Sequence, residues 1–147
     1  MSEDAIEGGA AAATETPVIW MVHRGTGLDG VAGSLAIEGD ALVFRPLEGG
    51  PPTWFPLRGI RHVRRVIGSP VLEIALRPGL EVPIVGFYFI RPPSLTGPDP
   101  SGRPVRRRTA RKYAAVRLRT WNAIKRDEIR AWVHNIRSAM QQHAATR

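Results

Sequence analysis

The chain has 147 residues, 43% of them hydrophobic, with no cysteine and a formal net charge of +8. That length suits one domain with a single core, and the lack of cysteine excludes disulfides, thiol nucleophiles, cysteine zinc sites and iron–sulfur clusters. No apolar run approaches the roughly 20 residues that span a bilayer. The acidic start Ser2-Glu3-Asp4 is unlike a secretory signal, so we expect a cytoplasmic protein.

The positive charge comes almost entirely from arginine, since only Lys112 and Lys125 are lysines. Arginine grips phosphate groups with a planar, two-pronged fork, which favours a phosphate-rich partner. A GC-rich genome, which also favours alanine, glycine and proline, explains the number of arginines equally well. It does not explain where along the chain they gather.

The first half of the chain has the pattern of an antiparallel sheet. Residues 1–16 are acidic and poor in large apolar residues, which predicts a disordered tail. From Pro17 onward, a short apolar strand at 18–22 precedes two alternating runs at 34–38 and 41–44. These two runs are joined by Gly39-Asp40, which is typical of a hairpin.

The sheet pattern continues to residue 90. Residues 53–57 predict an edge strand, because Pro56 has no amide hydrogen to donate to a neighbour. A basic segment at 58–65 carries apolar residues at intervals, and strands are predicted at 71–76 and 84–90.

The last third of the chain is predicted to contain an insert, a strand and a helix. Residues 92–112 form a basic, proline-rich insert, followed by a strand in which Ala114, Val116 and Leu118 face inward. A helix then begins after Asn122 as N-cap and runs to about residue 142, with one apolar stripe: Ile129, Trp132, Val133, Ile136 and Met140. We expect a single domain over 17–142 and a tail at 143–147.

This order of about seven antiparallel strands and one C-terminal amphipathic helix resembles the pleckstrin-homology (PH)-like domains, including GRAM-like domains, of bacterial type. The resemblance covers roughly residues 33–140 and is carried by the strands at 33–37 and 41–46, the segment 56–63, and the helix at 129–137 with its tryptophan. It implies a bent antiparallel sheet, or partly open barrel, with the helix closing one end. The strand at 18–22 is either additional to this pattern or an alternative first strand.

The resemblance implies a binding module rather than an enzyme. Phosphoinositide-binding members carry basic residues across the first hairpin, whereas Glu38-Gly39-Asp40 is acidic here. Specific inositol-phosphate recognition is therefore not expected at that place. Other members dock on peptides and proteins, so the fold alone does not decide the function.

The remaining chemical signals do not build an enzyme. Gly25, Gly27 and Gly30 match the dinucleotide fingerprint by letter, but a β-like segment follows instead of the helix that would meet a pyrophosphate. The four histidines are not paired, and Asp127 and Glu128 are helical neighbours that point in different directions. We expect no catalytic residues, no metal and no cofactor.

Residues 103–126 contain ten Lys and Arg and no acid. In the PH-like arrangement this segment would form a loop between the last two strands, at the end of the barrel away from the helix, and it would meet the basic segment at 58–65. The candidate anion-binding residues are Arg103, Arg106, Arg107, Arg108, Arg111, Lys112, Arg117, Arg119, Arg61, Arg64 and Arg65. The alternative is a solvated, partly disordered loop.

Two functions fit these residues. The first is a non-catalytic adaptor that docks on anionic lipid headgroups or on a protein partner, which would place the protein at the inner face of the membrane. The second is a nucleic-acid-associated basic protein without sequence-specific readout, because no base-reading motif is present. The sequence does not define an oligomeric state.

Overall fold

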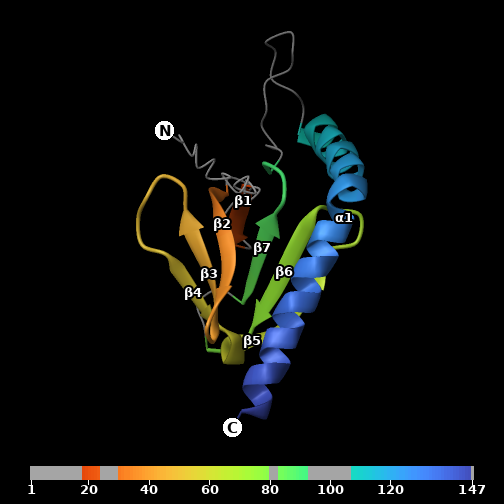
Figure 1. The fold of residues 1–147 in the computed structure, drawn as a ribbon. Coiled ribbons are helices and arrows are strands. Elements are labelled where there is room, and N and C mark those ends of the chain that lie inside the picture. The colour runs from red at the N-terminus through yellow and green to blue at the C-terminus, as the bar shows by residue number, and fades with distance from the viewer. Residues whose placement is uncertain (1–17, 24–29, 80–82, 93–106, 147) are drawn as a thin grey trace, which may run out of the picture.

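The structure is a computed structural model that describes residues 18–23, 30–79, 83–92 and 107–146. Its described strands form one antiparallel sheet in the order β4-β3-β2-β1-β7-β6-β5, which leaves β4 and β5 as edges, and one long helix follows the sheet (Figure 1). The elements are β1 (Ile19–His23), β2 (Val31–Glu38), β3 (Ala41–Pro46), β4 (Thr53–Pro56), the 3-10 helix η1 (Leu57–Gly59), β5 (Ile60–Arg65), β6 (Val71–Leu76), β7 (Ile84–Tyr88) and α1 (Arg107–Ala145). The predicted class, mainly β with one C-terminal helix, is confirmed.

The seven strands are not the seven that the sequence predicted. β1 lies in the middle of the sheet, where Met21 pairs with Val31 of β2 on one side and with Phe87 of β7 on the other. The segment that was predicted as the last strand, 114–118, is helical instead. The apolar run at 18–22 is therefore a central strand that joins the two halves of the sheet.

The prediction of a strand at 114–118 was wrong because two periods fit the same residues. Ala114, Val116 and Leu118 alternate, but Ala110, Ala114 and Leu118 are also spaced by four, which is the period of a helix. Alanine, arginine and leucine make up four of the five residues at 114–118, and all three favour helices. Because α1 already begins at Arg107, Asn122 lies inside the helix and is not its N-cap.

The local predictions for the hairpins hold. Gly39 adopts a positive φ of 58° at the turn between β2 and β3, a conformation that costs glycine little. The register then pairs Glu38 with Ala41 and Leu35 with Phe44. β4 pairs with β3 alone, so Pro56 lies on an edge strand as expected.

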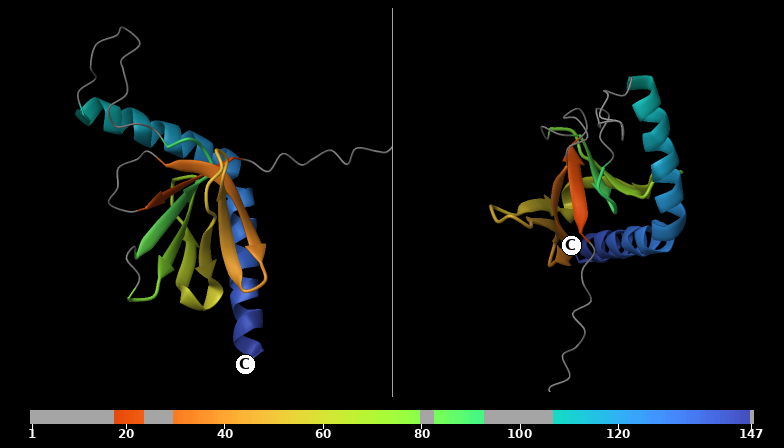
Figure 2. Two further views of the ribbon diagram at one scale, coloured as in Figure 1. Left: turned by 90° about the vertical axis from the view of Figure 1, so that its left-hand side faces the viewer. Right: turned by 90° about the horizontal axis from the view of Figure 1, so that it is seen from above.

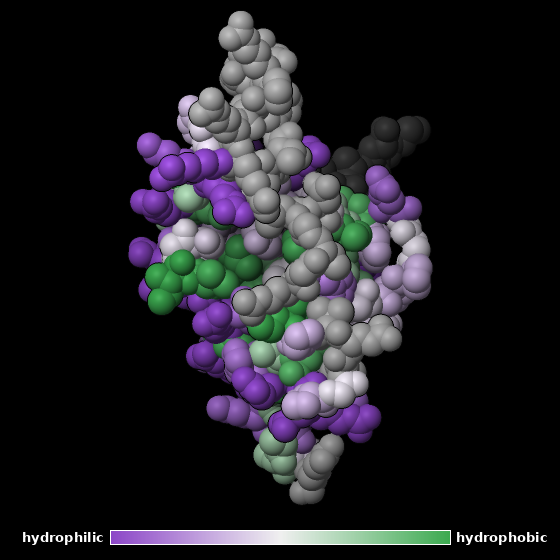
Figure 3. Space-filling view, turned by 180° about the vertical axis from the view of Figure 1, so that it is seen from behind, coloured by the Kyte–Doolittle hydropathy of each residue, from purple (hydrophilic) through white to green (hydrophobic). Residues whose placement is uncertain are grey.

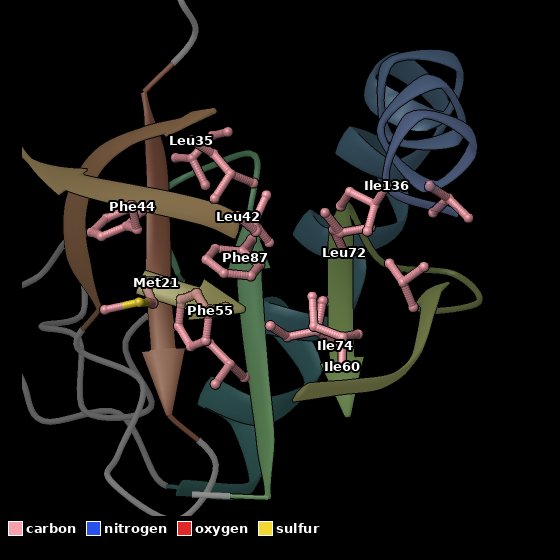
Figure 4. Packing of buried hydrophobic residues seen from close by; sticks show 14 of the residues in the cluster. Met21, Leu35, Leu42, Phe44, Phe55, Ile60, Leu72, Ile74, Phe87 and Ile136 are labelled. Atoms are coloured by element: carbon pink, nitrogen blue, oxygen red, sulfur yellow. The ribbon is translucent and has the colours of Figure 1, made fainter. Parts of the chain in front are cut away.

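The core fills the concave side of the curved sheet with aromatic and branched side chains (Figure 4). Phe87 lies at its centre, with its ring 6.2 Å from that of Phe44 and 5.9 Å from that of Phe55, the latter edge-to-face. Helix α1 adds Ile129 and Ile136, both fully buried, in the predicted helical stripe. A single core therefore spans the sheet and the C-terminal part of α1.

Helix α1 crosses the sheet from the β5–β6 side to the β2–β3 turn. It contacts β5, β6 and η1, and the Arg137 guanidinium donates to the Val63 carbonyl oxygen of β5 at 3.0 Å. Near its end, Nε2 of His143 lies 2.9 Å from the carbonyl oxygen of Gly39. The C-terminal part of α1 is thus fixed at both sides of the open sheet, and it continues to Ala145, beyond the predicted helix end at about residue 142.

Replacing Ile129 with alanine tests how strongly this packing holds the fold. Ile129 is fully buried, so Ile129→Ala should lower the free energy of unfolding by about 2–5 kcal/mol. The matched control is Ile124→Ala in the same helix, because Ile124 is 62% exposed and its loss should change stability by no more than about 0.5 kcal/mol. Urea unfolding followed by circular dichroism measures both, and equal effects would contradict the packing described.

Candidate anionic-surface interface

Helix α1 carries the net charge of the protein. Ten of the 21 Lys and Arg residues lie within it, against two of the 13 acids, Asp127 and Glu128, so its formal charge is +8. That value equals the net charge of the whole chain, and the remaining residues balance to zero. The excess of positive over negative charge in the chain is therefore equal to that of α1 alone.

The two ends of α1 have different surroundings because the helix bends along its length (Figure 2). The Thr120 hydroxyl donates to the Val116 carbonyl oxygen at 3.1 Å, a bond that often bends helices. The helical members of the core begin at Ile129. Before the bend, Ala110 and Ala114 are buried, but the longer side chains of the described turns are largely exposed.

One face of α1 carries a row of exposed cations. Arg108, Lys112, Arg119, Arg126 and Arg130 follow one another at intervals of four or seven residues, which places them on the same side of a helix. All five side chains are exposed. The ion pair within the described part of the helix belongs to Lys125, away from this row, with its Nζ 3.5 Å from Glu128.

A strip of apolar side chains lies beside this row, and the sequence analysis missed it. Tyr113, Val116 and Ile124 are 68%, 52% and 62% exposed and share one helical face with Thr120. Lys112 and Arg119 border Val116 on one side, whereas Arg117 borders Tyr113 on the other. The spacing i, i+3, i+7, i+11 from Tyr113 to Ile124 would have shown the strip, had the segment been read as a helix.

Not all of the three candidate arginines of strand β5 are free to bind an anion. Arg61 is exposed, but Arg64 forms an ion pair with Glu73 of β6 at 2.8 Å. Arg65 is partly buried and donates to the Asn122 side-chain oxygen of α1 at 2.9 Å. Arg65 therefore fixes the strand to the middle of the helix, and Arg61 is the exposed β5 candidate that has no ion pair among the described residues.

The turn after β5 exposes one further apolar residue next to this contact. Ile67 is 90% exposed, two residues beyond Arg65, which binds Asn122. Figure 3 shows the molecule from behind, where strongly hydrophilic side chains border hydrophobic ones. Hydrophilic and hydrophobic side chains are thus mixed on this face of the molecule.

The structure corrects where the predicted basic segment lies. Arg108, Arg111, Lys112, Arg117 and Arg119 extend from the helix that closes the sheet, and not from a loop at the opposite end of a barrel. They do not all share one side: Arg108, Lys112 and Arg119 belong to the row described above, whereas Arg111 and Arg117 point elsewhere. Arg107 is the first residue of α1, and Arg103 and Arg106 lie outside the described residues.

The first hairpin, β2–β3, contains an internal ion pair. Arg45 of β3 donates two hydrogen bonds to the Glu38 carboxylate of β2, at 2.6 and 2.7 Å, and the bond from Arg45 lowers the pKa of Glu38 below its usual value. The Arg45 guanidinium also lies 6.0 Å from the centre of the Trp54 ring. The hairpin presents no uncompensated cation to an anionic ligand.

The described residues were also compared with the requirements of a metal site, a membrane-spanning helix and a dinucleotide site. Within ranges 18–23, 30–79, 83–92 and 107–146, no three His, Asp or Glu side chains gather closely enough to hold a metal ion. No helix among these residues combines the length and apolarity needed to cross a membrane. Of the fingerprint glycines, Gly25 and Gly27 lie outside the described residues.

Comparison with known proteins adds no relative: no protein-family model matches the chain, and no curated protein matches it. The functional proposal therefore rests on the fold and on the surface of α1.

The cations at the start of α1 lie at the positive end of the helix dipole, which lowers the local stability of the first turns by a measurable amount. No acid lies in the first turn, although carboxylates there usually stabilise a helix by about 0.3–1 kcal/mol. Arg108→Glu should therefore slow amide hydrogen exchange in the first turns of α1 by roughly two- to fivefold. Arg130→Glu, placed mid-helix on the same row, is the control and should not slow it; unchanged exchange in Arg108→Glu would contradict the prediction.

Proposed function

We propose that the protein is a non-catalytic docking module of the PH-like type that attaches to anionic membrane surfaces through α1. The PH-like part of the proposal rests on the order of the elements: the meanders β1–β4 and β5–β7 are joined through the β1–β7 pair, and the one helix that follows them packs over the open sheet. The function depends on a different feature, the exposed surface of the helix.

The observation that carries the proposal is the concentration of the whole net charge on α1. The row from Arg108 to Arg130 is exposed, forms no ion pair with a carboxylate of the described strands, and lies on a helix whose C-terminal part is held by the core. A row of exposed cations along one helical face suits an anionic surface, because several of them can contact headgroups at once.

The expected strength is that of a reversible attachment. Each basic residue near an anionic leaflet contributes about 1 kcal/mol, so the five cations of the row supply roughly 5 kcal/mol. Attachment by charge alone is weakened by salt. Exchange on and off the surface follows from these magnitudes, and a peripheral location at the inner face of a membrane is part of the proposal.

A polynucleotide would satisfy the same cations, and so would an acidic protein. The exposed strip beside the row favours a membrane, since Tyr113, Val116 and Ile124 gain nothing from a phosphate backbone but can contact lipid. Nucleic acid and an acidic protein partner are therefore outcomes of the test below and not parallel proposals.

Co-sedimentation with anionic and neutral vesicles tests the proposal. The variant Arg108→Gln, Lys112→Gln, Arg119→Gln should reduce the partition coefficient on anionic vesicles by roughly 100-fold, which corresponds to about 3 kcal/mol for three charges. The matched control, Arg58→Gln, Arg77→Gln, Arg91→Gln, removes as many exposed charges from elsewhere in the fold and should retain most of the binding.

Three results would contradict the proposal. Equal binding to neutral and anionic vesicles would remove the electrostatic basis, and equal loss in both variants would make total charge, and not α1, responsible. Retention of the protein on polynucleotide when anionic vesicles compete at the same ionic strength would favour the nucleic-acid function instead.

A further inference from the structure

We propose that the apolar strip of α1, defined as Tyr113, Val116 and Ile124, enters the interfacial region of the bilayer when the protein docks. This inference rests on the proposed function and names its contact: hydrocarbon near the headgroups, in addition to their charges. Helices that lie in a membrane interface have this composition, with an apolar face and cations beside it.

The geometry of the helix supports insertion. The strip follows one face over three turns, and its side chains are more than half exposed. Lys112 and Arg119 border it on one side and Arg117 on the other, so their long side chains can reach headgroups while the strip lies deeper. Tyr113 combines a ring with a hydroxyl, which suits the boundary between lipid and water.

The core explains why the sheet does not cover the strip. The buried stripe of α1, including Ile129 and Ile136, holds the C-terminal part of the helix against β5 and β6. The helix bends before this part (Figure 2), and its earlier turns place only the small side chains of Ala110 and Ala114 in buried positions. The strip faces away from the stripe, toward solvent.

Electrostatics favours a lipid surface over a second copy of the chain as the partner that covers the strip. A second copy packed along it would bring two helices of formal charge +8 together, and like charges at close range repel. An anionic bilayer supplies both the counter-charge for the flanking cations and the apolar medium for the strip. The lipid surface is the occupant that satisfies both features.

An environment-sensitive fluorophore attached to a single introduced cysteine tests this inference, and the absence of native cysteine makes the labelling specific. The reporters are Val116→Cys and Ile124→Cys. One control is Ala115→Cys, the exposed neighbour of Val116 on another helical face, and the other is Leu47→Cys, an apolar residue 61% exposed after β3.

Each labelled variant is mixed with anionic vesicles, and pelleting is measured on the same samples. We expect the emission of both reporters to brighten and move to shorter wavelength on binding, with little change at the two controls. Unlabelled Ile124→Ser should pellet roughly tenfold less well, because the lost side chain no longer leaves water.

The outcomes separate insertion from docking. If the variants pellet but neither reporter changes, or all four positions change alike, insertion of the strip is wrong while charge-based docking stands. If the unlabelled protein itself does not pellet, both are wrong. Reporter signals confined to positions 116 and 124, together with weaker pelleting of Ile124→Ser, support the inference.

Discussion

The structure depends on the burial of one helical stripe against an open sheet. A curved sheet whose edge strands are β4 and β5 leaves apolar side chains such as Phe87 and Leu72 facing a hollow that water would otherwise fill. Ile129, Val133 and Ile136 cover them and become buried themselves. Because this contact fixes the C-terminal part of α1, it also determines where the earlier turns point and which of their side chains meet solvent.

Charge is distributed in a way that stability alone would not favour. Cations gather at the positive end of the α1 dipole, and no acid lies in its first turn. Beside these cations, the helix exposes a tyrosine, a valine and an isoleucine. In a helix with only a structural role, polar residues would be expected at such exposed positions. Features that cost local stability and have no compensation among the described residues are expected at functional surfaces; under our proposal, an anionic bilayer supplies counter-charge for the cations and an apolar medium for the exposed strip.

The sequence predicted those parts of the fold in which one period of hydrophobicity is unambiguous. The hairpin around Gly39 and the stripe from Ile129 to Met140 are such cases. Residues 114–118 fit two periods, and their helical state depends on continuity with the anchored turns that follow, which is a property of the whole chain. The candidate cations could be named from the sequence alone. Only the coordinates show which of them share an exposed row, as Lys112 and Arg119 do, and which make contacts inside the protein, as Arg65 does.

Hydrogen–deuterium exchange of the full chain, with and without anionic vesicles, measures most directly whether the outward turns of α1 are the docking surface. The account predicts that vesicles slow exchange in residues 108–124, whereas 129–140, already held by the core, and the edge strand β4 remain unchanged. Slowed exchange at β4 or the β2–β3 hairpin, with residues 108–124 unaffected, would contradict it.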